Sequence, residues 1–459
     1  MVGMLATRSG PRWLSALGTV GGLILAQAAT APAEAQIPGL AEWAQAVADA
    51  STRRWDGPRV PPPDPEPRPQ GLLRARSLWQ PLAVHGSPSL TDAVVDASLE
   101  ALEGARELLS SWGWPEPWPD GGRGGTAGFD LYLVPGNALA GEARADPSVA
   151  WAELDGVSSF AIIDAHMPAD RLEACVVATY AEAMLLGQDP AEARAWRRAT
   201  GALLAWLATG TYGCEDGVVR QQQEPWRGWI AQESEDGAGG ALLLAMVSGR
   251  HDGGSGAFVR DVWQLARQRT WEGTELRASP DLWQALATAT DVAGDDLLEI
   301  VEETAIARWH TGTVDRERGA PLLALRGLGA DALVPAVAEL AWQDLPAHTR
   351  PADPPLEPFG SGYAIVDVSA APPNSRLRIW LRGEFGVRWS LVAVRLDRRG
   401  RELARLAAPS RREPRSYVPL ELLEDTARVL IVVTNLSSRL PDADVADENV
   451  RSFKLIVDR

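Results

Sequence analysis

The hydrophobic period of the chain changes at one proline-rich segment, Leu345-Pro-Ala-His-Thr-Arg-Pro-Ala-Asp-Pro-Pro355. Before it, apolar residues recur at helical spacing, as in Thr91–Trp112 with Leu99 and Leu102. After it, apolar and polar residues alternate. Because a helix repeats about every 3.6 residues and a strand every two residues, the two patterns predict different structures. The sequence therefore predicts an α+β protein, with a mainly helical part followed by an all-β part.

The helical part is predicted to contain a small sheet as well. Two apolar segments, Phe129–Val134 and Ser158–Asp164, are predicted to be strands that could pair. The helix after Pro190 has a strong start signal, because Asp189 is a good N-cap and Glu192 lies at the N3 position. The predicted helices are Thr91–Trp112, Pro168–Gly187, Pro190–Ala208, Gly239–Ser248, Ala257–Arg269, Ser279–Thr288 and Asp295–Trp309.

The all-β part is predicted to be a small sandwich, because its short strands are separated by turn residues. Its predicted strands are Leu377–Arg382, Trp389–Leu396, Arg401–Ala407, Arg428–Thr434 and Ser452–Val457. The resulting domains are residues 71–344, mainly helical, and residues 358–459, a β-sandwich, with a linker at 345–357. A short helix and a proline-rich connector are expected over residues 36–70.

The N-terminus is typical of an export signal over residues 1–35. Arg8 and Arg12 precede an apolar stretch, and Ala33-Glu34-Ala35 supplies a small-x-small cleavage pattern. A membrane anchor is the alternative, because the apolar stretch is long for a signal. No later stretch is long enough to span a bilayer. We therefore expect an exported protein, periplasmic or extracellular, without a membrane span after signal removal.

Charge and cysteine content narrow the class of protein further. The 459-residue chain has a net charge of −17. We therefore expect no nucleic-acid partner, because no basic stripe is present to neutralise phosphates. The chain has two cysteines, Cys175 and Cys214, and a pair in an exported protein favours a disulfide. Closing the loop between them would stabilise the fold by roughly 4 kcal/mol in the chain-entropy model.

One helix and the turn that follows the next helix resemble the core of gluzincin-type zinc metallopeptidases. That family carries H-E-x-x-H on one helix and a glutamate in a later W-x-x-E-G turn. Here Thr179-Tyr180-Ala181-Glu182-Ala183 stands at the first motif, and Trp206-Leu-Ala-Thr-Gly210 stands at the second. The order of the flanking helix and strands is also similar, over roughly residues 70 to 340. The resemblance implies a metallopeptidase-like domain whose zinc ligands and catalytic glutamate are absent.

The residues at the vestigial positions are poor substitutes for the family's ligands. Thr179 is not a useful zinc ligand, and Ala183 has no donor atom. Tyr180 is too weak a base near neutral pH, and Thr209 replaces the family's third ligand. If the family geometry holds, Cys175 and Cys214 flank the vacated site, and a disulfide joins elements that zinc once joined. We therefore expect no zinc and no peptidase catalysis.

Other candidate sites remain open from the sequence. A hydrolase with a rebuilt site in the same cleft would have to use nearby acids, namely Glu182, Glu215 and Asp216. Loop tryptophans could stack on a peptide or sugar ligand, although such residues more often fill a core: Trp112, Trp114, Trp118, Trp226 and Trp229. An acidic loop could hold calcium, although its spacing matches no EF-hand: Asp442, Asp444, Asp447 and Glu448.

The preferred functional hypothesis is an exported, non-catalytic binding protein of the envelope or extracellular space, whose partner is an unknown peptide, protein or glycan. The first alternative is the rebuilt hydrolase. The second is a surface- or glycan-binding protein that acts through the β-domain. No cofactor is expected beyond the possible calcium ion.

Overall fold

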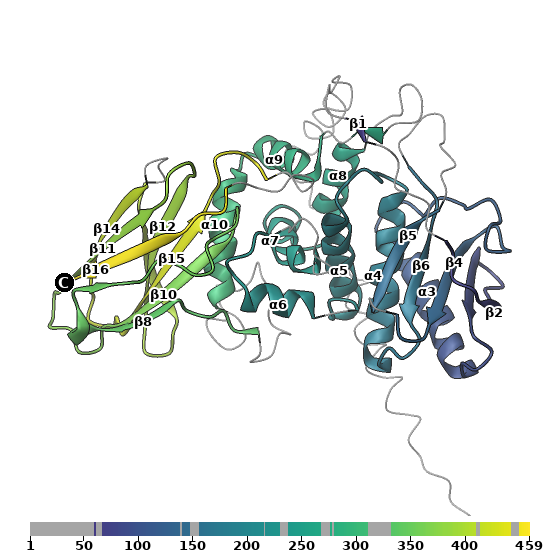
Figure 1. The fold of residues 1–459 in the computed structure, drawn as a ribbon, viewed down its shortest axis with the longest axis horizontal. Coiled ribbons are helices and arrows are strands. Elements are labelled where there is room, and N and C mark those ends of the chain that lie inside the picture. The colour runs from purple at the N-terminus through teal and green to yellow at the C-terminus, as the bar shows by residue number, and fades with distance from the viewer. Residues whose placement is uncertain are drawn as a thin grey trace, which may run out of the picture. The chain divides into compact units, whose positions relative to one another are not determined.

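A computed structural model of the chain describes residues 59–60, 67–137, 140–146, 156–214, 216–229, 237–267, 276–277, 280–310, 332–409, 414–441 and 449–459. The predicted export signal, the start of the connector, Glu215 and the predicted calcium loop lie outside these residues. The predicted α+β class is confirmed (Figure 1). None of the described helices combines the length and the apolarity that a bilayer span requires.

The first sheet contains five strands in the order β2-β3-β4-β6-β5. Its strands are β2 (Leu72–Arg76), β3 (Leu82–Gly86), β4 (Phe129–Val134), β5 (Gly141–Ala145) and β6 (Ser159–Asp164). The central strands β3, β4 and β6 are parallel, and the predicted pairing of β4 with β6 is present. The two edge strands, β2 and β5, run antiparallel to their neighbours.

Helices α3 (Asp92–Ser111) and α4 (Ala169–Leu186) pack against each other and against this sheet (Figure 1). Both follow the predicted ranges closely. Side chains alternate between the two faces of a strand. Tyr132, Phe160 and Ile162 form a small separate cluster on one face, while Leu131 and Ile163 alternate to the other face and are fully buried.

The helical region continues with six further helices among the described residues: α5 (Arg194–Thr209), α6 (Gly217–Gln223), α7 (Ala241–His251), α8 (Ala257–Ala266), α9 (Leu282–Val292) and α10 (Leu297–Trp309). A 3-10 turn, Gly237–Gly240, precedes α7, and the short strands β1 (Arg59–Val60) and β7 (Leu276–Arg277) pair antiparallel. Helices α4 and α5 pack closely because α5 contains Gly201, where a Cβ would lie 2.7 Å from the carbonyl oxygen of Ala178.

Helix α5 begins later than the capping signal predicts. Ala193 is its N-cap residue, so the predicted N-cap at Asp189 is wrong. The Asp189 carboxylate accepts a hydrogen bond from the Ala191 amide inside a turn. Glu192 instead accepts a hydrogen bond from the Leu282 amide at 2.6 Å, at the start of α9. A tertiary contact thus uses the carboxylate that the local pattern assigned to the capping box of α5.

The C-terminal part is a sandwich of two sheets, as predicted. The five-stranded sheet has the order β13-β12-β15-β10-β8, and the four-stranded sheet has the order β14-β11-β16-β9. Their bounds are β8 (Ala338–Ala341), β9 (Ala347–His348), β10 (Ser361–Asp367), β11 (Arg376–Gly383), β12 (Trp389–Leu396), β13 (Glu402–Ala407), β14 (Arg415–Glu421), β15 (Arg428–Asn435) and β16 (Phe453–Asp458). Inward residues of both sheets, among them Ile379 and Ile431, form one buried core.

The predicted linker belongs to the sandwich. Strand β9, inside the predicted linker, pairs with β16, and β8, at the end of the range predicted as the helical domain, pairs in parallel with β10. Leu345 and Leu356, inside the segment predicted as a linker, are buried in the sandwich core. Proline cannot donate to a strand ladder, but a short edge strand tolerates it, and this explains why a proline-rich segment can still belong to a sheet.

The two sheets of the sandwich differ in how much of their surface is covered. Helix α10 packs on the side of the five-stranded sheet that points away from the sandwich core, where Ile306 and Trp309 contact a cluster that includes Val394. The Tyr363 hydroxyl on β10 donates a hydrogen bond to the Ala305 carbonyl at 2.6 Å. Strand β12 is therefore buried along most of its length, whereas β11 alternates between buried and exposed residues.

Candidate functional site

Helix α4, which carries the segment predicted to resemble the zinc-binding motif, is buried from Ala174 to Leu186. Thr179 is 1% exposed, and its hydroxyl donates to the backbone carbonyls of Cys175 and Val176. The Tyr180 ring packs edge-on against Phe129 with centroids 5.1 Å apart. Burial raises the pKa of the Tyr180 phenol further above its usual value. These residues are engaged in core packing and in bonds within the helix, so they do not fit a zinc site.

A disulfide lies beside Thr179, as the cysteine pair predicts. It joins Cys175 on α4 to Cys214, in the loop that follows α5. Edge strand β5 passes directly over it at Gly141. A Cβ on Gly141 would lie 2.3 Å from the Cys214 sulfur, 2.6 Å from the Cys175 sulfur and 2.9 Å from the Thr179 methyl carbon. The space around Thr179 is therefore filled by the disulfide and the backbone of β5.

The position predicted to correspond to the family's third zinc ligand lies at the end of α5. Thr209 is the last residue of that helix, and its hydroxyl donates to the Ala205 carbonyl at 2.8 Å. The same oxygen accepts a hydrogen bond from the Thr211 amide at 3.1 Å. Gly210 then adopts φ 78°, a left-handed conformation that ends the helix. Thr209 thus organises a helix terminus through local hydrogen bonds.

Glu182, a candidate acid for a rebuilt hydrolase, lies beneath strand β5. It accepts a hydrogen bond from the Ala143 amide at 3.4 Å, and Arg198 Nε lies 3.8 Å from its other oxygen. Arg198 also donates to the Gly141 carbonyl at 3.1 Å. Burial raises the pKa of Glu182 against the attraction of Arg198. Together these two side chains hold β5, an edge strand among the described residues, against α4 and α5.

The other candidate acids do not join Glu182. Asp216 is mostly exposed and forms an ion pair with Arg171 at 2.7 Å, whereas Glu182 is buried. The structure therefore does not bring Asp216 and Glu182 together as an acid–base pair. Glu215 lies outside the described residues.

The predicted ligand-binding tryptophans differ in burial. Trp229 is 2% exposed and lies against the guanidinium of Arg308, 4.5 Å from the ring centroid, and Trp114 is equally buried. Trp118 packs over Gly156 and Gly187, and Trp226 packs against the sandwich core. Trp112 ends α3 and is half-buried. A buried ring offers no face to a ligand, so the binding hypothesis retains only the three half-buried rings.

A cluster of charged residues that was not predicted from the sequence lies on the face of the first sheet that carries Tyr132 and Phe160. The Arg68 guanidinium donates to both oxygens of Asp146, at 2.9 and 2.7 Å, and to Asp120 at 2.7 Å. It also donates to Asp130 on β4, which is in turn bonded to His85 Nε2 at 2.8 Å. The three aspartates are at most 2% exposed. We refer to these five residues as the Arg68 network.

Further hydrogen bonds stabilise the carboxylates of the Arg68 network. The carboxylate of Asp120 also accepts from the amides of Gly122 and Gly124, so the glycine-rich loop wraps around it. Burial raises the pKa of Asp130, but the hydrogen bonds from His85 and Arg68 outweigh this effect and hold the pKa below its usual value. The network therefore anchors the end of the proline-rich connector to the sheet.

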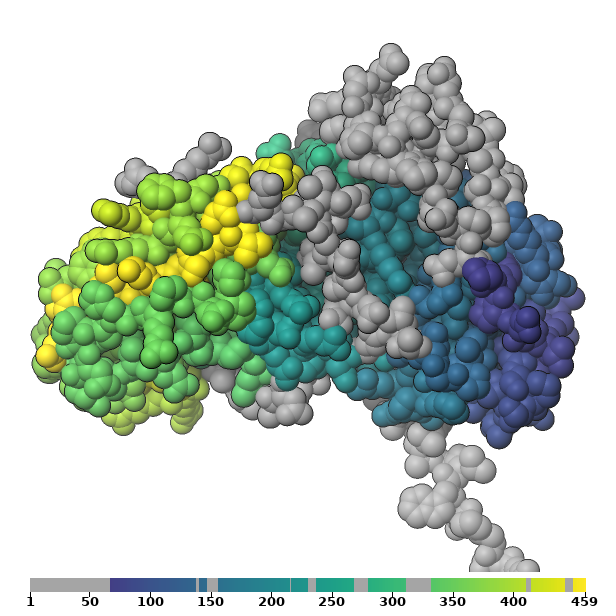
Figure 2. All heavy atoms as spheres, viewed as in Figure 1, coloured from purple at the N-terminus to yellow at the C-terminus, as the bar shows by residue number. Residues whose placement is uncertain are grey.

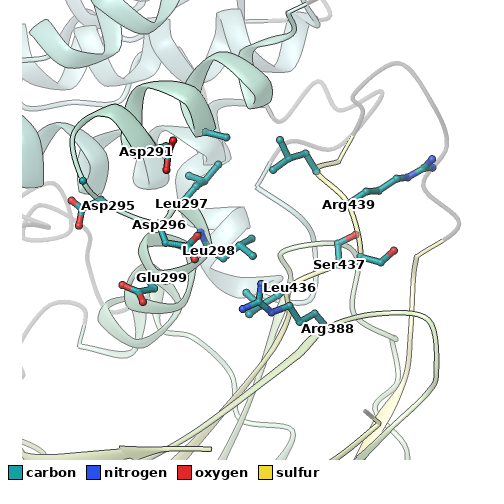
Figure 3. A pocket seen from close by; sticks show the side chains of 14 residues that line it. Asp291, Asp295, Asp296, Leu297, Leu298, Glu299, Arg388, Leu436, Ser437 and Arg439 are labelled. Atoms are coloured by element: carbon teal, nitrogen blue, oxygen red, sulfur yellow. The ribbon is translucent and has the colours of Figure 1, made fainter. Parts of the chain in front are cut away.

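A pocket of about 890 Å³ lies where helices α9 and α10 meet the β-sandwich. Its acidic residues come from the helical side, and Arg388 and Arg439 come from the opposite side (Figure 3). Asp295 is held by Arg250 at 2.6 Å, and Asp296 caps α10. The described residues that line the pocket include no histidine or cysteine. The carboxylates, serines and arginines of its lining suit a small polar ligand.

In the described part of the chain, no three or more His, Cys, Asp or Glu side chains are grouped so that they could hold a metal ion. In the Arg68 network, the guanidinium occupies the centre of the three aspartates. The predicted calcium loop, with Asp442 and its neighbours, lies outside the described residues.

Comparison with known proteins gives little further information. No protein-family model matches the chain, and no curated protein matches it. Among solved structures, it is similar to the pre-peptidase C-terminal domain of a collagenase from Bacillus anthracis, with 11% sequence identity and a TM-score of 0.19. The match covers 27% of this chain and 96% of that domain. A TM-score this low supports no conclusion about fold or function.

Proposed function

We propose that the chain is an exported, non-catalytic binding protein in which a metallopeptidase-like fold serves as a scaffold. The observation that carries the proposal is the filled space around Thr179. Gly141, the Cys175–Cys214 disulfide and the Thr179 methyl group meet there in direct contact. A substrate carbonyl and an attacking water would both need that space.

The buried charges of this region support the same proposal. A general base must reach the proton that it removes, directly or through one water. Glu182 instead accepts a hydrogen bond from the backbone of β5 and lies near Arg198, with almost no exposed surface. Its hydrogen bond and its burial are those of a structural residue. Export is supported by the N-terminal sequence and by the disulfide, which persists in oxidising compartments.

The first test is the zinc content of the purified protein, isolated without chelator or affinity histidines and measured by elemental analysis. We expect zinc well below one equivalent. One equivalent of zinc would overturn the proposal, because it would require ligands other than Thr179, Tyr180, Ala183 and Thr209.

The rebuilt hydrolase is tested in parallel with a fluorescent casein and a library of short peptide substrates. We expect equal background signals from the wild type, from Glu182→Gln and from the surface variant Asp216→Asn. Activity that purifies with the protein and disappears in Glu182→Gln, but persists in Asp216→Asn, would replace the binding proposal with the hydrolase.

A surface-binding role for the β-domain is a second candidate, favoured by a separate observation. The outer face of its four-stranded sheet is exposed and carries basic and aromatic side chains, although the whole chain is acidic. Binding through that face requires no cleft in the helical part. The two candidates are compatible, because one describes the scaffold and the other the surface that it presents.

A further inference from the structure

The exposed face of the four-stranded sheet is built from alternate residues of three strands. On β11 these are Arg376, Arg378, Trp380 and Arg382; on β14 they are Arg415, Tyr417, Pro419 and Glu421; on β16 they are Lys454, Ile456 and Asp458. The residues between them point into the sandwich core. We call this exposed surface the outer face. In Figure 2, β16 is visible at the surface as a yellow band beside green atoms of the β-domain.

Three cations lie side by side across the outer face. Arg382 is directly opposite Arg415 on one neighbouring strand and Lys454 on the other. All three are exposed, and none forms an ion pair or side-chain hydrogen bond with the described part of the chain. Neighbouring strands are about 4.8 Å apart, and like charges directly opposite each other are destabilising. We call these three residues the cationic row.

The cationic row differs from the other arginines on the same face. Arg376 pairs with Glu421 at 3.1 Å, and Arg378 pairs with Asp458 at 3.5 Å. Among the described residues, carboxylates therefore lie beside these two arginines but not beside the cationic row. An external anion is the partner that would remove the repulsion within the row.

An apolar strip runs parallel to the cationic row and is displaced from it by two residues on each strand. Tyr417 lies opposite Trp380, and Trp380 lies opposite Ile456. The Trp380 and Tyr417 rings are stacked, with centroids 5.1 Å apart, and Tyr417 is 41% exposed. The two rows are separated by about 7 Å, the length of two residues in a strand. A ligand that spans both rows must combine regularly spaced anions with apolar surface.

We propose that the outer face binds an acidic polysaccharide, whose chain lies across the strands with its anionic groups on the cationic row and its sugar rings against the apolar strip. This inference rests on the proposed binding function. Guanidinium groups match carboxylates and sulfates in a bidentate geometry, and the C–H faces of sugars pack on aromatic side chains. A polymer with a charge on each sugar presents anions to all three cations of the row.

Other anionic partners fit the outer face less well. Double-stranded DNA carries one charge per about 1.7 Å, far denser than cations about 4.8 Å apart. The net charge of −17 repels every polyanion, and it repels DNA more strongly than a polymer with one charge per sugar because DNA is more densely charged. Membrane insertion requires apolar groups that project from the surface, whereas Trp380 and Ile456 are half-buried. Charge spacing and burial thus favour a less densely charged polymer.

The test measures binding of the full protein to polygalacturonate by isothermal titration calorimetry, with dextran as the neutral polymer. We expect binding to polygalacturonate that weakens with added salt, and none to dextran. The double variant Arg382→Gln/Arg415→Gln should bind roughly tenfold more weakly or worse, because it loses two charge-assisted contacts. Tyr417→Ala should also weaken binding.

The matched control is Arg398→Gln/Arg399→Gln, which removes the same charge from the exposed turn between β12 and β13. It should bind like the wild type. An equal loss in both double variants would overturn the proposal, because only net charge would then matter. Tighter binding to single-stranded DNA or to phosphatidylglycerol vesicles would overturn it in favour of those partners. A wild type that binds none of these also overturns it, while zinc content and peptidase activity report separately on the proposed function.

Discussion

Beside the first sheet, the half-buried Arg68 is surrounded by three buried aspartates, whereas on the outer face of the β-sandwich Arg382 lies between two other cations. All three nitrogens of the Arg68 guanidinium donate to a carboxylate. The exposed Arg382 has no such partner in the described part of the chain. A buried charge must be compensated inside the protein, whereas an exposed charge is solvated by water and stays accessible to an external partner. The difference indicates which region is structural and which is available for binding.

The largest expected effect in this comparison is on Arg68. The variant Arg68→Met should lower the free energy of unfolding by about 3–5 kcal/mol, because three buried aspartates lose their shared cation. The control Arg376→Met removes an exposed ion pair and should cost under about 1 kcal/mol. Urea unfolding at pH 7 measures both. Similar losses in the two variants would remove the distinction between buried and exposed charge.

The free energy of unfolding should depend on pH in the acid range because of the Arg68 network. The pKa of Asp130 is held below its usual value, so the folded protein keeps this carboxylate ionised where the unfolded chain, with a pKa near 3.9, binds a proton. Its contribution is fully present above about pH 5 and is lost as the pH falls through the folded pKa.

The variant Asp130→Asn should therefore differ most from the wild type near neutral pH, and the difference should shrink below pH 4. Urea titrations at pH 7, 5, 4 and 3 measure it. The exposed Glu424→Gln serves as a control and should track the wild type at every pH. A constant difference between Asp130→Asn and the wild type would mean that Asp130 does not titrate with the Arg68 network.

A smaller effect is expected at the filled space beside Thr179. Gly141→Ala places a methyl group against both disulfide sulfurs and should cost about 1–3 kcal/mol, as overpacking does. Gly104→Ala, in helix α3, meets no atom within 4 Å and should stabilise the protein by up to about 1 kcal/mol. Thermal unfolding of the two variants gives both signs. A neutral Gly141→Ala would show that the space beside Thr179 is open.

The smallest effect should be seen on the outer face, with the opposite sign to Arg68. Arg382→Gln removes the central charge of the cationic row and should raise stability by a few tenths of a kcal/mol. The gain should fade in 0.5 M salt, where exposed charges are screened. A loss of stability would show that Arg382 has a stabilising partner within the protein.

Regular elements were predictable where local pattern and tertiary environment agree. Strand β4 has the predicted bounds, and helices α3 and α4 differ by a residue at each end from their predicted ranges. Both helices are long and strongly periodic. Some missed elements are short or lie at edges, such as β5 and β9, where few residues carry the pattern. The seven-residue strand β10, inside the five-stranded sheet, was missed as well.

The candidate sites were only partly predictable. The disulfide followed from two cysteines in a chain that is predicted to be exported, and the candidate positions on α4 followed from a resemblance that stays a prediction. The Arg68 network could not be predicted, because its aspartates are widely separated in sequence and come together only when the sheet forms. The cationic row depends on register: Arg382, Arg415 and Lys454 are neighbours only once three strands are paired.

The covering of one sheet by helix α10 has a practical consequence for dividing the gene into fragments. A fragment that begins at residue 356 would lack α10 and strand β8, and would open the apolar surface around Tyr363 and Val394 to water. Such a fragment should precipitate or recruit unrelated proteins, and its apparent stickiness would be mistaken for recognition. A soluble shorter version should begin before α10, at or before residue 295.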